Sequence, residues 1–130
     1  RRDDVFGVVH THSTFCTAWA CRGKTMPCIT SEGAELVGGT VKCAAFVPPG
    51  SIELAEVTSE ALGNDSAVLM GNHGVICVGA NIDKAFNNAI IMEKEAKVAF
   101  YAYQMGDVNT LDEQMCIYLK EDVEKNYGQR

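Results

Sequence analysis

The sequence predicts a mixed α/β fold in which helices cover a sheet. Short apolar runs rich in β-branched residues alternate along the chain with segments whose apolar residues recur at helical spacing. The 130 residues are 47% hydrophobic and 22% charged, which is an ordinary globular composition. This length fits one domain over residues 1–130, and the apolar content argues against a disordered chain.

The first elements are a strand and a helix. Residues 5–9 form a short β-rich run, which predicts a buried strand. Residues 13–23 predict a helix, because Ser13 is a suitable N-cap and Gly23 a suitable stop signal. The chain opens on a charged stretch without a methionine and reaches the strand by Val5. We therefore expect an N-terminal segment of the domain to precede this sequence.

The next stretch is less regular. Residues 26–29 predict a short extended piece, and residues 32–39 are partly helical and end on two glycines. Residues 40–47 predict a strand. The sequence Pro-Pro-Gly at 48–50 ends it, because proline cannot donate to a sheet and glycine favours a turn.

A helix and a pair of strands follow. Residues 51–62 predict a helix, because Ser51 can cap its first turn and two glutamates complement the helix dipole. Two apolar runs then occupy residues 67–71 and 74–78, with an Asn-His pair between them. This pattern predicts two strands that meet at a tight turn.

Residues 83–104 predict the longest helix. Phe86, Ile90 and Phe100 recur on one side of it, which we expect to be the apolar face of the helix. Glu93 falls on the same stripe. We interpret it as a buried carboxylate that binds backbone groups or a partner helix, in preference to a catalytic residue.

Residues 111–125 predict a final, more polar helix. The chain has no run of about 18 uncharged apolar residues, so the sequence predicts no membrane helix. The formal net charge of −6 argues against nucleic-acid binding, which requires Lys and Arg against phosphates. No secretory signal is visible, and we expect a cytoplasmic protein.

Six cysteines allow a disulfide interpretation, because an even number is typical of small secreted domains. Their spacings are irregular, however, and most of them lie inside apolar patterns. We therefore expect reduced thiols that pack as small hydrophobic side chains. The residues are Cys16, Cys21, Cys28, Cys43, Cys77 and Cys116.

The placement of the three histidines is the main functional signal. If the first strand continues through His10 and His12, side-chain alternation puts both imidazoles on one face. His73 lies in the turn between the two later apolar runs. Three histidines with an open fourth position are the ligands of a catalytic zinc site, where the ion acts as a Lewis acid. Spacing alone equally allows three ordinary hydrogen-bonded histidines.

Three stretches of the chain resemble the class II aldolase/adducin family. Residues 5–23 are similar to the family's strand, His-x-His motif and helix. Residues 66–86 are similar to its strand, Asn-His-Gly turn and following helix, and residues 127–129 to its C-terminal tyrosine segment. The resemblance extends over essentially the whole chain. It implies a three-layer α/β/α fold with a central mixed, largely antiparallel sheet covered by helices.

The resemblance also implies a site. His10, His12 and His73 match histidines that bind one Zn²⁺ per subunit, and Tyr127 matches a catalytic proton donor. The family forms homotetramers with active sites between subunits, so Tyr127 could serve a neighbouring subunit. Glu35 lies near the place of an aspartate in the family's epimerases and could assist proton transfer. A surface carboxylate is the alternative interpretation of Glu35.

The function implied by the resemblance is zinc-dependent cleavage of a ketose 1-phosphate, such as L-fuculose 1-phosphate, to dihydroxyacetone phosphate and an aldehyde. One alternative is an L-ribulose-5-phosphate 4-epimerase, which breaks and re-forms the same bond. Another is an adducin-like module for assembly or binding, without catalysis.

The chain also departs from the family pattern. The family's catalytic glutamate and phosphate-binding loops lie upstream of the stretch that residues 5–23 match. Residues 30–32 are Thr-Ser-Glu where the fuculose aldolases have a tyrosine, and no histidine follows His73 as one does in the epimerases. The phosphate loops and the catalytic base are therefore expected outside this sequence.

Overall fold

The computed structural model describes residues 2–126, which contain a four-stranded sheet. The strands are β1 (Gly7–Thr11), β2 (Cys43–Ala44), β3 (Ala67–Met70) and β4 (Gly74–Gly79), in the spatial order β1-β4-β3-β2. Strand β4 pairs antiparallel with both β1 and β3, whereas β2 pairs parallel with β3. The expected mixed, largely antiparallel sheet is therefore confirmed.

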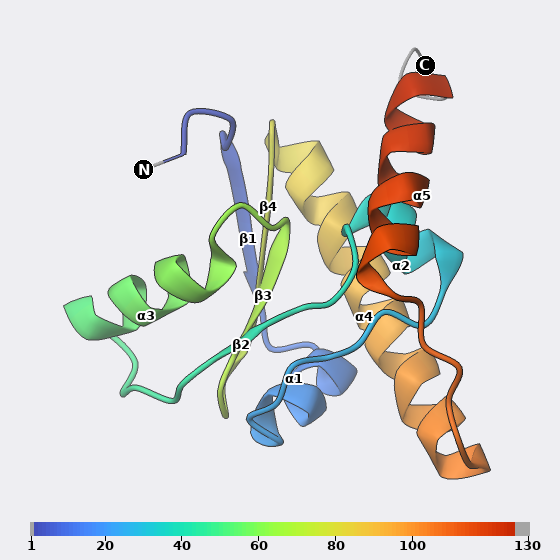
Figure 1. The fold of residues 1–130 in the computed structure, drawn as a ribbon. Helices are drawn as coiled ribbons and strands as arrows, with labels where there is room; N and C mark the ends of the chain where they lie inside the picture. Colours follow the sequence, from blue (N-terminus) through green and yellow to red (C-terminus); the bar gives the residue numbers. More distant parts are fainter. Residues whose placement is uncertain (1, 127–130) are drawn as a thin grey trace.

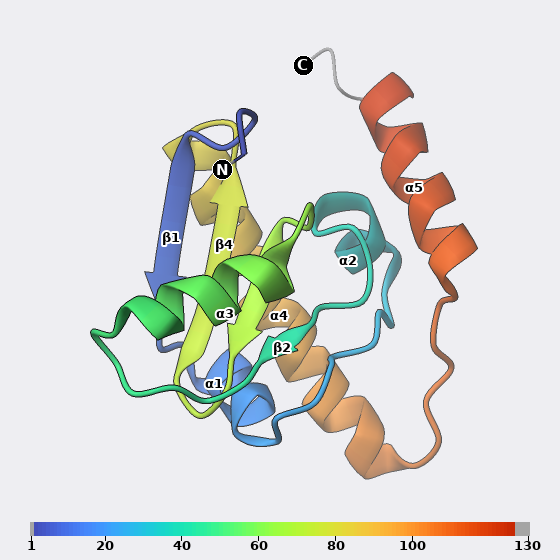
Figure 2. The ribbon, with the colours of Figure 1, turned by 60° about the vertical axis from the view of Figure 1, so that its left-hand side comes forward.

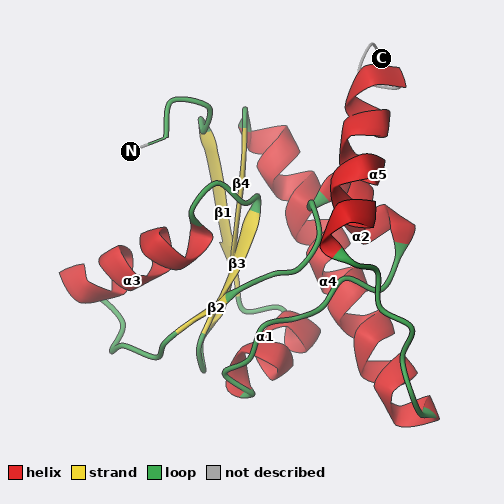
Figure 3. Cartoon of the chain, viewed as in Figure 1, coloured by secondary structure: helices red, strands yellow, loops and turns green. Residues whose placement is uncertain are grey.

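Helices cover both faces of this sheet in the described part of the chain: α1 (Thr14–Cys21), α2 (Ser31–Leu36), α3 (Ile52–Leu62), α4 (Ile82–Met105) and α5 (Glu113–Asn126). Helix α3 covers one face, and α1 and α4 cover the other (Figure 1). Helices α2 and α5 pack against each other to one side of the sheet, beyond its β3–β2 edge, and α2 also contacts α4 (Figure 2). Figure 3 shows long loops between α1, α2, β2 and α3, in contrast to the short turn between β3 and β4.

The pairing of β1 with β4 defines two ends of the sheet. Gly7 lies opposite Gly79 at one end, and His10 lies opposite Ile76 toward the other. Strands β3 and β4 meet in the predicted tight turn, where Asn72 has a φ of 55°. Asparagine tolerates this left-handed conformation better than most residues, because its short polar side chain can form local hydrogen bonds.

The main core lies between the sheet and the layer formed by α1 and α4. Leu69 and Val75 of the sheet and Met92 of α4 are completely buried in it. The indole N–H of Trp19 donates a hydrogen bond of 3.2 Å to the carbonyl of Ala96, which joins α1 to α4. The packing of α1 on α4 therefore includes a satisfied polar group as well as apolar contact.

Helix α4 packs on the sheet through a different face from the one its large apolar residues predict. Phe86 and Ile90 are 57% and 52% exposed, and Phe100 is 40% exposed, so that prediction was wrong. Small side chains make up much of the buried face together with Ile91 and Met92, whereas Phe86, Ile90 and Phe100 lie on the outer face. The small residues of the buried face are Ala85, Ala89, Ala96 and Ala99. None of the helices within residues 2–126 combines the length and the hydropathy needed to cross a membrane.

The predicted strand over 40–47 is much shorter in the structure. It is reduced to the two residues of β2 and one isolated antiparallel bridge between Met26 and Val41. Two prolines follow, and they lack the N–H groups that a longer ladder requires. Helix α3 begins as predicted, because the hydroxyl of Ser51 accepts a hydrogen bond of 3.1 Å from the Leu54 N–H.

All six cysteines are free thiols, and four of them are buried. Burial raises the pKa of the Cys77 thiol to about 12. Burial likewise raises the pKa of the Cys16 thiol. Thiols with raised pKa values carry little nucleophilic thiolate at neutral pH, so these residues act as packing groups.

Candidate metal centre

The structure brings the three histidines together at the end of the sheet where β3 turns into β4. Their ring centroids lie 4.8 Å apart for His10 and His12, and 4.9 Å apart for each pair that includes His73. One ligand nitrogen from each ring can be chosen so that all three lie within 4.8 Å of one another. His10 and His12 are exposed and His73 is half-buried, so the cluster is open to solvent.

Strand register explains why these rings converge. His10 lies within β1 and His12 follows its last residue by one position, so alternation directs both side chains to one face. His73 is held in the neighbouring turn, where its N–H donates a hydrogen bond of 2.9 Å to the Met70 carbonyl. The Asn72 N–H donates to the Ala20 carbonyl at 3.1 Å, which fixes the turn against α1.

Hydrogen bonding orients the ring of His10. Its Nδ1 lies 3.0 Å from the Val75 carbonyl, so Nδ1 carries the hydrogen and donates it. Its Nε2 then keeps a free lone pair, and this atom lies 3.0 Å from Nε2 of His12. A backbone acceptor of this kind is the usual outer partner of a metal-binding histidine.

The donor set fits a divalent metal ion. Tetrahedral Zn²⁺ with bonds of about 2.0–2.1 Å places its nitrogen ligands about 3.3 Å apart, close to the separation of the two Nε2 atoms. Nδ1 of His73 is buried and has no hydrogen-bond partner within the described chain. Burial, then the charges of His10 and His12, lower the pKa of His73. A lowered pKa favours the neutral imidazole that a metal requires.

Gly74 lets the two strands approach closely at this site. A Cβ at this position would lie 2.3 Å from the Thr11 carbonyl oxygen and 3.1 Å from Cδ2 of His12. Only glycine therefore fits beside the end of β1. In the sequence, the Asn-His-Gly order at 72–74 is the signal of this glycine.

Glu93 is tied to backbone groups, as the sequence interpretation expected. Its two carboxylate oxygens accept hydrogen bonds from the Phe15 and Cys16 N–H groups, at 2.8 and 3.0 Å. Ser13, the N-cap of α1, makes no side-chain cap bond, so Glu93 supplies the cap from α4. Burial raises the pKa of Glu93, but these bonds and others from Ser13 and Cys16 outweigh burial and lower it.

The remaining predicted site residues are not in the cluster. Glu35 lies on α2 and lines a hollow near Gly79, at the other end of β4, so within one chain it does not reach the histidines. Tyr127 lies outside the described residues. A different hollow of about 430 Å³, between α3 and the sheet, is lined by Ile76, the pairing partner of His10, and by Met70.

Comparisons with known proteins agree on one family. Residues 1–100 match the model of the class II aldolase and adducin N-terminal domain. The L-fuculose phosphate aldolase of Methanococcus maripaludis is 33% identical over 99 residues, which are 76% of this chain and 53% of that protein. The 5-deoxy-D-ribulose 1-phosphate aldolase of Bacillus thuringiensis is 32% identical over 130 residues, which are 100% of this chain and 60% of that protein.

A solved structure agrees with these sequence matches. An L-fuculose 1-phosphate aldolase superimposes with a TM-score of 0.91 at 29% identity, and the match covers 95% of this chain and 57% of the other. The chain thus spans 53–60% of the length of the relatives named here.

Proposed function

This chain belongs to the class II aldolase and adducin family, and on that premise we propose that it carries the metal centre of a sugar-phosphate aldolase. The observation that carries this proposal is the convergence of three imidazoles on one solvent-open point. Relatives described as L-fuculose phosphate aldolase and 5-deoxy-D-ribulose 1-phosphate aldolase favour a ketose 1-phosphate as the substrate. The products would be dihydroxyacetone phosphate and an aldehyde, formed in the cytoplasm.

His10, His12 and His73 would hold one Zn²⁺ per subunit. When bound, the ion supplies Lewis-acid stabilisation of the negative charge that develops on substrate oxygens as a carbon–carbon bond breaks. The Val75 carbonyl keeps Nε2 of His10 available as a donor by binding the hydrogen on Nδ1. The hollow beside Ile76 lies on the same sheet face and offers room for the substrate chain.

Tyr127 is proposed as the proton donor of the site. In the direction of bond formation its hydroxyl would donate a proton to the aldehyde oxygen, which becomes a hydroxyl group of the product. In cleavage the same proton returns to the tyrosine. This residue would act in a homotetramer with active sites between subunits. A catalytic role for Glu35 would likewise require that it serve the site of another subunit.

The test combines metal content with product analysis. Purified protein should contain about one zinc per chain by native mass spectrometry, and His73→Ala should lose it, because two imidazoles bind far more weakly than three. Glu53→Ala, an exposed position on α3, is the matched control and should keep the metal.

Activity separates the enzyme classes. An aldolase releases dihydroxyacetone phosphate from L-fuculose 1-phosphate, whereas an epimerase converts L-ribulose 5-phosphate to D-xylulose 5-phosphate without releasing a triose. A binding module of the adducin kind would give neither product. If His73→Ala retained full zinc, the proposed centre would be wrong.

A further inference from the structure

A second hollow lies at the Gly79 end of β4, away from the histidines. It has a volume of about 630 Å³, within the size range of small-molecule sites. Its walls are formed by the segment before β1, the end of β4, the start of α4, and helices α2 and α5. We call it the polar cavity. Its lining includes the side chains of Asn88, Lys84, Lys120, Glu35 and Glu124.

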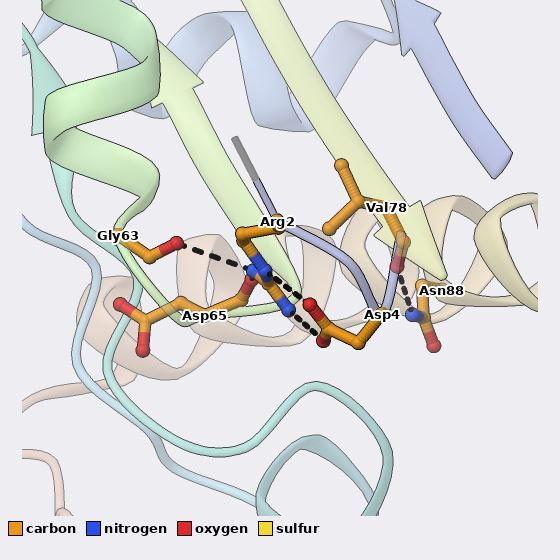
Figure 4. A network of polar contacts seen from close by, with 6 residues as sticks. All are labelled: Arg2, Asp4, Gly63, Asp65, Val78 and Asn88. Carbon is orange, nitrogen blue, oxygen red and sulfur yellow. Dashed lines mark hydrogen bonds and ion pairs between the residues drawn. The ribbon is translucent and has the colours of Figure 1, made fainter. Parts of the chain in front are cut away.

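Asn88 gives the polar cavity an unsatisfied acceptor. The residue is only 1% exposed and lines the cavity. Its Nδ2 donates a hydrogen bond of 2.9 Å to the Val78 carbonyl, so the orientation of the amide is fixed. Oδ1 points away from that carbonyl (Figure 4) and has no hydrogen-bond partner among residues 2–126. A buried acceptor without a partner costs free energy, so this atom calls for a donor such as a hydroxyl group.

Four charged side chains without ion-pair partners in the described chain line the same cavity as this acceptor. Lys84 and Lys120 line the polar cavity, and neither takes part in an ion pair within the described chain. The same is true of the carboxylates of Glu35 and Glu124. The cavity therefore offers two cationic groups for an anion and two carboxylates that can accept further hydrogen bonds.

The arginine at the edge of the cavity has a different role. Arg2 is paired with Asp4 at 2.6 Å and also donates to the carbonyls of Gly63 and Asp65 (Figure 4). Its hydrogen-bonding capacity is largely used, and its charge is compensated. It therefore fastens the segment before β1 to the turn after α3 and forms a wall of the cavity.

From these groups we infer that the polar cavity binds a polyol that carries one anionic group, such as a phosphate. Lys84 and Lys120 would hold the anionic group. A hydroxyl of the ligand would donate to Oδ1 of Asn88, and other hydroxyls to the carboxylates of Glu35 and Glu124. A water molecule could satisfy Asn88 alone, but it would form an ion pair with neither Lys84 nor Lys120, which have none within the described chain. This inference is independent of the metal centre.

The probe is D-sorbitol 6-phosphate, an open-chain polyol phosphate without a carbonyl group, so the aldol reaction cannot consume it. Binding to the full chain is followed by isothermal titration calorimetry and by NMR of the Asn88 side-chain amide, in the presence of EDTA. We expect a saturable Kd of about 1 mM or below. The double variant Lys84→Met/Lys120→Met should weaken binding at least about tenfold, because charge-assisted hydrogen bonds are lost.

Matched controls locate the effect. Lys24→Met removes one lysine charge from an exposed position outside the cavity, and it should leave the affinity for the probe unchanged. Unphosphorylated sorbitol and inorganic phosphate should each bind more weakly than the probe. His73→Ala should bind the probe as the wild type does, which separates this site from the metal centre. Absence of binding at about 10 mM probe, or unchanged affinity in the double variant, would overturn the inference.

Discussion

The two ends of strand β4 carry different chemistry on the same pair of strands. At the Gly74 end, one ligand nitrogen from each of three histidines can converge. At the Gly79 end, two lysines and two glutamates that form no ion pair within the described chain line a cavity together with the buried amide of Asn88. Neutral nitrogen donors suit a divalent metal ion, whereas mixed charges and an amide suit a hydroxylated anion. One sheet can thus present a metal centre and a polar binding site without shared residues.

Acidification should affect the histidines at the Gly74 end of β4 far more than the cavity at its Gly79 end. All three imidazoles must be neutral to bind metal, and histidine ordinarily titrates near pH 6.5. Zinc affinity should therefore fall at least about 100-fold between pH 7 and pH 5, which competition titration with a chelator would measure. The lowered pKa of His73 reduces this loss but does not remove it.

In the metal-free protein, protonation of His73 should also change the free energy of unfolding. The pKa of His73 is lower in the folded than in the unfolded chain, so the unfolded chain binds its proton first. The free energy of unfolding should accordingly fall as pH falls through about 6.5. Zinc occupancy that stays constant down to pH 4 would contradict a centre made of histidines.

Alanine substitution of the glycines at each end offers a matched pair. A Cβ on Gly74 would lie 2.3 Å from the Thr11 carbonyl oxygen, and one on Gly79 would lie 2.8 Å from the Ala85 nitrogen. Each variant should lose at least about 2 kcal/mol of unfolding free energy in urea titrations, because backbone must move. Only Gly74→Ala should also weaken zinc binding, since its Cβ contacts His12. Equal zinc affinity in both variants would argue against the close approach at that end.

The smallest expected effect concerns the cap that α4 gives to α1. Glu93→Gln removes the charge and one of two acceptors, and should cost about 1 kcal/mol of unfolding free energy at pH 7. The pKa of Glu93 is lowered by folding, so its contribution is present above the unfolded pKa and lost as pH falls through the folded one. The difference between variant and wild type should therefore shrink below about pH 4.

A matched variant tests whether the cap acts locally. Lys94→Met changes the neighbouring residue of α4, which pairs with Glu32 on the surface, and should have little effect on the unfolding free energy. Helix α1 follows His12 directly, so Glu93→Gln should also lower zinc affinity slightly. An unfolding difference that does not depend on pH would contradict the capping role.

The sequence predicted what local patterns and spacing determine. Strand β1, the β3–β4 pair and helix α3 follow from apolar runs, an Asn-His turn and the Ser51 cap. The cluster of His10, His12 and His73 was also predictable, because strand alternation and one turn suffice to bring the three side chains together.

The rest depends on contacts between distant elements. The buried face of α4 could not be predicted from Phe86, Ile90 and Phe100, because that face combines four alanines with Ile91 and Met92. The polar cavity has no motif, since separate parts of the chain each contribute only two or three of its lining residues. By resemblance, Glu35 could assist proton transfer, and within one chain it lines the cavity at the Gly79 end of β4, away from the histidines.

The pairing of β1 with β4 has a consequence for folding kinetics. Strands β3 and β4 form a local hairpin, so the turn that holds His73 can assemble early. His10 and Val75 are 65 positions apart, and such long-range pairs form slowly because a long loop must close first. The refolding chain should become able to capture zinc only when β1 joins β4. Zinc uptake would then report when this long-range pairing forms.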